Sequence, residues 1–140
     1  RRHVDRSVRA VQTVLHSGVV AGGGSAYLAA AQSLARLTPD SQLRYGLMAL
    51  AHALQAPLRQ IVANAGHDDP SAVLAQLRRG APGQCYDAVR NEIVDHAGAG
   101  IYDSCDTLCE ALRTAASGAT MVISTGALVL KRNPETSLEP

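Results

Sequence analysis

Three consecutive glycines, Gly22–Gly24, are the residues of this sequence that most suggest ligand chemistry. They stand in GVVAGGGSAY, directly before a segment rich in alanine, the strongest helix former. Glycine tolerates positive φ angles, and its missing side chain lets another group come close to the backbone. The run therefore predicts either a tight turn between helices or a ligand cradle. Because it is neither GxGxxG nor a Walker A loop, its spacing favours the turn.

The other candidate groups give weaker signals. Cys105 and Cys109 lie one helical turn apart, but no second pair and no HxxxH completes a zinc site. We therefore interpret them as buried structural thiols and expect no metal. Nothing resembles the GxSxG nucleophile elbow, so a hydrolytic triad has little support and we assign no catalytic residue.

Composition sets the class of protein. The 140 residues suit one domain, and the core must rest on Leu, Val, Ile and Ala because Phe and Trp are absent, which favours an all-helical fold. A net charge of +1 without a basic block argues against a nucleic-acid partner, and no apolar run is long enough to span a membrane. Three cysteines without a signal peptide predict reduced thiols and a cytoplasmic protein. The chain opens on Arg inside a predicted helix, so we expect a piece of a longer protein.

Helical periodicity and breaker residues predict the elements. A helix is expected over 3–16, another over Ser25–Leu37, and a third from about residue 41 that is interrupted at Pro57 and stops at Gly66. Residues 72–79 form a short helix, and 84–103 a small hairpin or irregular turns. A last helix covers 103–130, although 127–130 could equally be a strand, and a disordered tail follows. Its predicted inward residues are Leu108, Leu112, Ala115, Ala119, Val122 and Ile123.

Several stretches together resemble the group I chaperonin family, the GroEL type. They are GVVAGGGSAYLAAA, ALQAPLRQIVANAG and CYDAV followed by GIYDSCDTLCEALRTAASGATMVISTGALV. The resemblance covers nearly the whole chain. It implies that residues 1–132 are the C-terminal part of an equatorial domain and 133–140 a flexible tail. The implied fold is mainly α, a helical bundle with a small β-hairpin and a short C-terminal strand.

The resemblance also implies a nucleotide site. Gly22 and Gly23 would lie against the ribose and adenine side of ATP, Asp87 and Ala88 would hold the adenine edge, and Asp103 would bind a ribose hydroxyl. In the family, the phosphates and Mg²⁺ are held by a loop of the other equatorial half, which this chain lacks. We therefore expect ATP as cofactor, with no metal ligand from this chain.

Two departures from the family pattern bear on activity. Asp87 replaces an Asn, which removes a donor and adds a charge, and Arg6 stands where the family has the acid that supports attack of water on the γ-phosphate. This chain should therefore not hydrolyse ATP by itself. Arg59 and Asp68 match opposite charges near the contact of two rings, or are ordinary surface charges.

Two functions remain open at this stage. The chain belongs to a ring-forming, ATP-dependent chaperonin whose partners are sister subunits, a co-chaperonin and unfolded clients. Alternatively, it comes from a divergent paralogue that has lost ATPase activity and serves as a binding or scaffolding protein.

Overall fold

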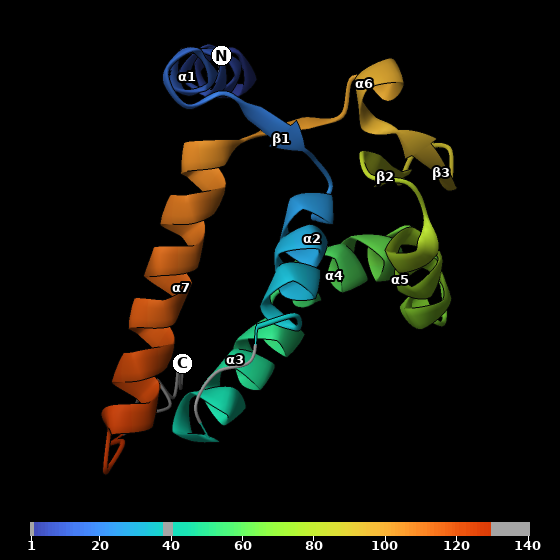
Figure 1. The fold of residues 1–140 in the computed structure, drawn as a ribbon. Coiled ribbons are helices and arrows are strands. Elements are labelled where there is room, and N and C mark those ends of the chain that lie inside the picture. The colour runs from blue at the N-terminus through green and yellow to red at the C-terminus, as the bar shows by residue number, and fades with distance from the viewer. Residues whose placement is uncertain (1, 38–40, 130–140) are drawn as a thin grey trace, which may run out of the picture. The chain divides into compact units, whose positions relative to one another are not determined.

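The computed structural model describes residues 2–37 and 41–129, without the side chains of residues 2, 3, 6 and 41. The chain divides into two units, 1–108 and 109–140, which are described separately. Figure 1 shows the elements in chain order: α1 (Arg2–Ser17), β1 (Val19–Ala21), α2 (Ser25–Leu34), α3 (Ser41–Ala53), α4 (Ala56–Asn64), α5 (Pro70–Arg79), β2 (Gln84–Asp87), β3 (Glu92–Asp95), α6 (His96–Ala99), β4 (Tyr102–Ser104) and α7 (Cys105–Ser124). The mainly helical fold predicted from the sequence is confirmed.

Helix α1 matches the helix predicted over 3–16. Gly18, at φ +76°, ends it, and the Gly18 N–H donates to the Val14 carbonyl at 2.8 Å. The apolar residues that recur at three- and four-residue spacing are nevertheless exposed, and they are Val4, Val8, Val11 and Leu15. No part of the described chain covers this stripe.

Breaker residues end and restart the central helices where the sequence predicts. Helix α3 stops at Ala53, and α4 begins with Pro57 in its first turn, where the missing N–H of proline costs nothing. Gly66, at φ +97°, follows the end of α4. Asp69 caps α5 by accepting a hydrogen bond from Ser71 N at 2.9 Å. Helix α2 ends three residues before the predicted Leu37.

Two short antiparallel pairs of strands complete the first unit. Strands β2 and β3 form a hairpin with Gln84 opposite Asp95 and Asp87 opposite Glu92, which confirms the predicted hairpin for 84–95. The rest of the 84–103 segment contains α6 and β4. Strands β1 and β4 also pair, with Val20 opposite Asp103, and the sequence did not predict this pairing. Strands of three residues carry too little alternation to be recognised.

The core of the first unit joins α2, α4, α5 and β2. Its centre is Leu58 and Val62 of α4, both completely buried. As the composition requires, aliphatic side chains dominate, and Tyr86 is the one aromatic member. The cluster of buried residues is Leu28, Leu58, Val62, Leu74, Leu77 and Tyr86.

The second unit departs from the sequence prediction. Helix α7 ends at Ser124, not near Leu130, and none of its residues is buried. Of the predicted inward residues, Leu108 and Leu112 are half-buried, but Val122 and Ile123 are 76% and 85% exposed, so the prediction is wrong for the C-terminal part of the helix. Periodicity predicts that an apolar face will be covered, but it does not say by what.

The predicted C-terminal strand is also wrong for residues 127–129, which form no strand. A strand needs a partner for its backbone groups, and no described segment pairs with these residues. Residue 130 and the predicted tail, 133–140, lie outside the described residues. Among the helices in 2–37 and 41–129, none combines the length and apolar character needed to cross a bilayer.

Cys85 gives a prediction for the pH dependence of stability. Its thiol is completely buried on β2, and burial, followed by the charges of Asp87 and Asp95, raises the pKa of Cys85 above its ordinary value of 9.0. The unfolded chain therefore ionises this thiol at a lower pH than the folded chain does. The stabilisation is complete below pH 9.0 and is lost as the pH rises through the folded-state pKa.

We expect the free energy of unfolding, measured by urea titration in reductant, to decline above pH 9.0. The decline should be smaller in Cys85→Ala. Parallel pH profiles for the two proteins would assign the decline to other groups.

Candidate functional site

The segments that carry the predicted nucleotide residues meet at one corner of the first unit, between β1 and α2 (Figure 1). The Gly22 N–H donates to the Ile101 carbonyl at 3.0 Å, which ties the glycine run to the segment entering β4. A Cβ on Gly23 would lie 3.3 Å from the Tyr86 carbonyl oxygen, so the run also touches β2. Asp87 follows Tyr86 directly, and Asp103 lies two residues after Ile101.

Two of the three glycines are required by the packing of the chain itself. A Cβ on the buried Gly22 would lie 3.0–3.1 Å from atoms of Ile101 and Tyr102. Gly24 is also buried at φ +81°, and a Cβ there would lie 2.8 Å from the Leu58 nitrogen. The tight turn therefore accounts for Gly22 and Gly24. Gly23 is half-buried at φ +65°, and of the three glycines it has the most space where a Cβ would stand.

Asp103 is the best-suited acceptor at this corner. It lies on β4 opposite Val20 and is half-buried. Its carboxylate has no hydrogen-bond or ion-pair partner in the part of the chain that the structure describes. The next residue, Ser104, is fixed, because its hydroxyl accepts from Thr107 N at 3.4 Å and lies 3.3 Å from the Ser17 hydroxyl. A positioned carboxylate without a partner can accept a hydrogen bond from a ligand hydroxyl.

Asp87 is engaged within its own hairpin turn. Its Oδ1 accepts from Val89 N at 2.9 Å and from Arg90 N at 3.1 Å, and its Oδ2 lies 3.8 Å from the Arg90 Nε. These contacts partly neutralise the negative charge of the Asp87 carboxylate. An Asn, which the family that the sequence resembles has at this position, carries no such charge. Ala88 follows in the exposed part of the turn. The groups that remain available to a ligand at Asp87 and Ala88 are mainly those of the backbone.

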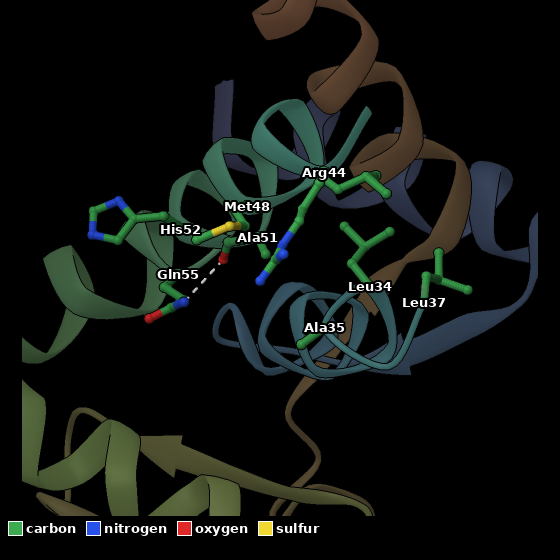
Figure 2. A pocket seen from close by; sticks show the side chains of 9 residues that line it. Leu34, Ala35, Leu37, Arg44, Met48, Ala51, His52 and Gln55 are labelled. Atoms are coloured by element: carbon green, nitrogen blue, oxygen red, sulfur yellow. Dashed lines mark hydrogen bonds between the residues drawn. The ribbon is translucent and has the colours of Figure 1, made fainter. Parts of the chain in front are cut away.

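The predicted nucleotide residues do not line either of two well-formed pockets. One, of about 580 Å³, lies beside α2, α5 and the 80–84 loop and includes Ser25, whose buried hydroxyl has no partner among the described residues. The other, of about 620 Å³, is lined by residues of α2 and α3, and Figure 2 shows side chains of both helices, among them Arg44 of α3 and Leu34 of α2. Sequence reasoning missed both pockets, because neither has a motif. The candidate site is an open face rather than an enclosed cavity.

The remaining predicted residues are placed as follows. Arg6 belongs to α1, and its side chain lies outside the described set, so its role stays a prediction. Cys105 is half-buried, but Cys109 is exposed, so the prediction of two buried thiols is wrong for Cys109. Periodicity alone could not show that this face of α7 is uncovered. Among the side chains that the structure describes, no group of three or more His, Cys, Asp or Glu could hold a metal ion.

Arg59 links α4 to α5. Its Nη1 donates to the Ser71 hydroxyl at 3.0 Å. Hydrogen bonds from the backbone and hydroxyl of Ser71, with a smaller contribution from the Arg59 charge, lower the pKa of Asp69 from its ordinary value. Asp68 is exposed. The Arg59 contact therefore has a local role, whatever its role between subunits.

Comparison with known families accounts for almost the entire chain. A family model described as the TCP-1/cpn60 chaperonin family matches residues 1–133. The matched range contains the glycine corner, both strand pairs and all of α7. Because the match extends over 133 of the 140 residues, the chain belongs to the TCP-1/cpn60 chaperonin family, whose members assist protein folding as assemblies that interact with client proteins.

Proposed function

We propose that this chain is the C-terminal part of the equatorial domain of a group I chaperonin and supplies the ribose and adenine side of an ATP site. The convergence of three separate segments at the glycine corner carries this proposal. The Gly22–Ile101 hydrogen bond and the Gly23–Tyr86 contact bring the loop, β2 and β4 together. These segments contain Gly22, Gly23, Asp87 and Asp103 of the residues that the family resemblance assigns to the nucleotide, and Ala88 directly follows β2.

Each residue has a defined task in the proposed site. Asp103 accepts a hydrogen bond from a ribose hydroxyl, which suits its unpartnered carboxylate within the described chain. Gly23 permits close approach, and Asp87 and Ala88 present backbone groups to the base edge. The Asp87 carboxylate fits this task less well, because it is engaged by Val89 N and Arg90 N.

ATP, when bound, supplies the γ-phosphate whose hydrolysis drives the chaperonin cycle. Residues of this chain bind and orient the nucleoside part, and Mg²⁺ and the phosphates are held by residues outside it. Arg6 cannot act as a base, since a guanidinium stays protonated and has no acceptor. This chain is therefore not hydrolytic by itself.

The proposed partners are sister subunits in a cytoplasmic ring, a co-chaperonin and unfolded clients. The exposed apolar stripe of α1 supports an assembly, because large uncovered apolar patches mark contact surfaces. Within that assembly, Arg59 and Asp68 contribute to contacts between rings.

Asp103 provides the test of the nucleotide site. In the full-length protein that carries this chain, we expect Asp103→Ala to weaken ATP binding about 10- to 100-fold, the effect of losing a hydrogen bond to a charged group. Titration calorimetry measures the change, and Asp106→Ala, an exposed carboxylate in the first turn of α7, should bind as the wild type does. A wild-type protein without nucleotide affinity would contradict the proposed function. Equal affinity of Asp103→Ala and wild type would remove Asp103 from the site.

The second candidate is a paralogue that has lost ATPase activity and acts as a binding or scaffolding protein. Arg6 at the position of the acid and Asp87 at the position of the Asn favour it. If this candidate holds, Arg6→Asp in the full-length protein should raise phosphate release about 100- to 10,000-fold, the usual contribution of a positioned base. Phosphate release by the unmodified protein at the rate of the variant would exclude this candidate.

A further inference from the structure

We infer that Tyr86, Asn91 and His67, here called the Asn91 latch, position the Asp87–Ala88 segment for base recognition, an inference that rests on the proposed function. The three residues come from β2, the hairpin turn and the loop after α4. None is predicted to touch the nucleotide. They are positioning residues, and they act through the turn that separates β2 from β3.

A single amide oxygen joins the three members of the latch. Asn91 Oδ1 accepts hydrogen bonds from the Tyr86 hydroxyl and from His67 Nε2. Because that oxygen is only an acceptor, His67 must carry a hydrogen on Nε2. The rings of His67 and Tyr86 also meet edge-on, with centroids 5.8 Å apart and planes at 69°. The hairpin turn is thereby tied to the loop after α4.

The same asparagine closes the turn that holds the predicted base edge. Asn91 is the only described residue other than glycine with a positive φ, 62°, and its N–H donates to the Asp87 carbonyl at 2.8 Å. The Asp87 carboxylate closes the turn from the other side through Val89 N and Arg90 N. Ala88 lies between these two sets of bonds. The orientation of the Ala88 backbone groups therefore depends on the position of Asn91.

Tyr86 connects the latch to the glycine corner. Its side chain is 97% buried within the core cluster, its relative exposure being 3%, while its carbonyl oxygen is the contact of Gly23. The backbone of Tyr86 thus touches one predicted ligand element, and its hydroxyl holds the turn that carries the other. Tyr86 therefore connects Gly23 to the turn that carries Asp87 and Ala88.

Asn91→Gly tests the latch, because glycine accepts the positive φ and removes only the amide side chain. In the full-length protein, we expect ATP affinity to fall about 5- to 10-fold, the usual worth of one to two hydrogen bonds. GTP affinity should change less, so the ratio of ATP to GTP affinity falls. Hydrogen exchange at the amides of Val89, Arg90 and Asn91 should accelerate by a similar factor.

Three further variants keep the test valid even if Asn91→Gly fails to fold. Tyr86→Phe removes only the hydroxyl and should lower the same ratio. His67→Leu should do so as well, whereas His67→Gln, which keeps an N–H donor, should restore most of the wild-type ratio. A role in stability alone would not show this rescue in the choice between ATP and GTP.

The outcomes separate the latch from the proposed function. A wild-type protein that binds neither ATP nor GTP contradicts the proposed function. It also contradicts the latch inference, which rests on that function. A wild type that binds, with variants of unchanged ATP to GTP ratio and unchanged exchange, overturns the latch alone. If ATP affinity and GTP affinity fall equally and the unfolding midpoint also falls, the latch has a merely structural role. That outcome would also overturn the latch inference.

Discussion

Gly24→Ala is expected to lower the free energy of unfolding by about 2–5 kcal/mol, the sum of a left-handed backbone and an overpacked contact. Gly24 has φ +81°, which side chains with a Cβ rarely adopt. Its new Cβ would lie 2.8 Å from the nitrogen and 3.0 Å from the Cα of Leu58. These are backbone atoms of α4, so no change of rotamer relieves the contact. Either α2 or α4 must shift, and both contribute to the core.

Gly18→Ala is the matched control for Gly24→Ala. Gly18 has nearly the same conformation, φ +76°, but a Cβ there would meet nothing within 4 Å. Only the conformational cost remains, about 1–2 kcal/mol. Urea titrations of the two variants therefore separate the backbone cost from the packing cost. Equal losses for the two would show that the approach of Gly24 to α4 does not restrain the fold.

Leu58→Ala is expected to cost about 2–5 kcal/mol, as for other large-to-small changes in a packed core. Leu58 is completely buried, and it belongs to the cluster that joins α2, α4, α5 and β2. Leu15→Ala on α1 is the control, since Leu15 is 79% exposed and the cost should stay below about 0.5 kcal/mol. Chemical denaturation of both variants measures the difference. A small loss for Leu58→Ala would place the centre of the core elsewhere.

The two substitutions should not compensate each other. An alanine at position 58 keeps the nitrogen, Cα and Cβ that a Cβ on Gly24 would meet. The double variant should therefore lose more stability than Leu58→Ala alone, because the contact of the new Cβ with the backbone of residue 58 remains. A double variant more stable than Gly24→Ala would mean that the crowding lies in the Leu58 side chain.

Local sequence signals predicted the helices of this chain well. Pro57 marks the restart at α4, Gly66 ends α4, and Asp69 caps α5, as the structure confirms. Each signal acts over a few residues, through a missing N–H, a left-handed φ or a side-chain cap. Such effects do not depend on the rest of the fold.

The candidate site was predicted only as a set of residues. The family resemblance named Gly22, Gly23, Asp87, Ala88 and Asp103, and their contacts with nucleotide stay predictions. The spacing of the glycine run favoured a tight turn, but the sequence did not reveal that Gly22 approaches Ile101 and Gly24 approaches Leu58. Nor did it reveal that the Asp87 carboxylate closes a turn, because side-chain bonds of this kind depend on the hairpin already being formed.

The amino-acid order alone thus determined the helical class, the breaks between helices and the membership of the chaperonin family. The tertiary structure decided the pairing of β1 with β4, where Ser17 and Ser104 approach from 87 positions apart, and it decided which apolar faces are covered. The physical reason is the separation along the sequence between the residues that interact. Capping and helix hydrogen bonds form between near neighbours in sequence, whereas strand pairing, burial and the approach of Gly24 to Leu58 require distant segments to be packed first.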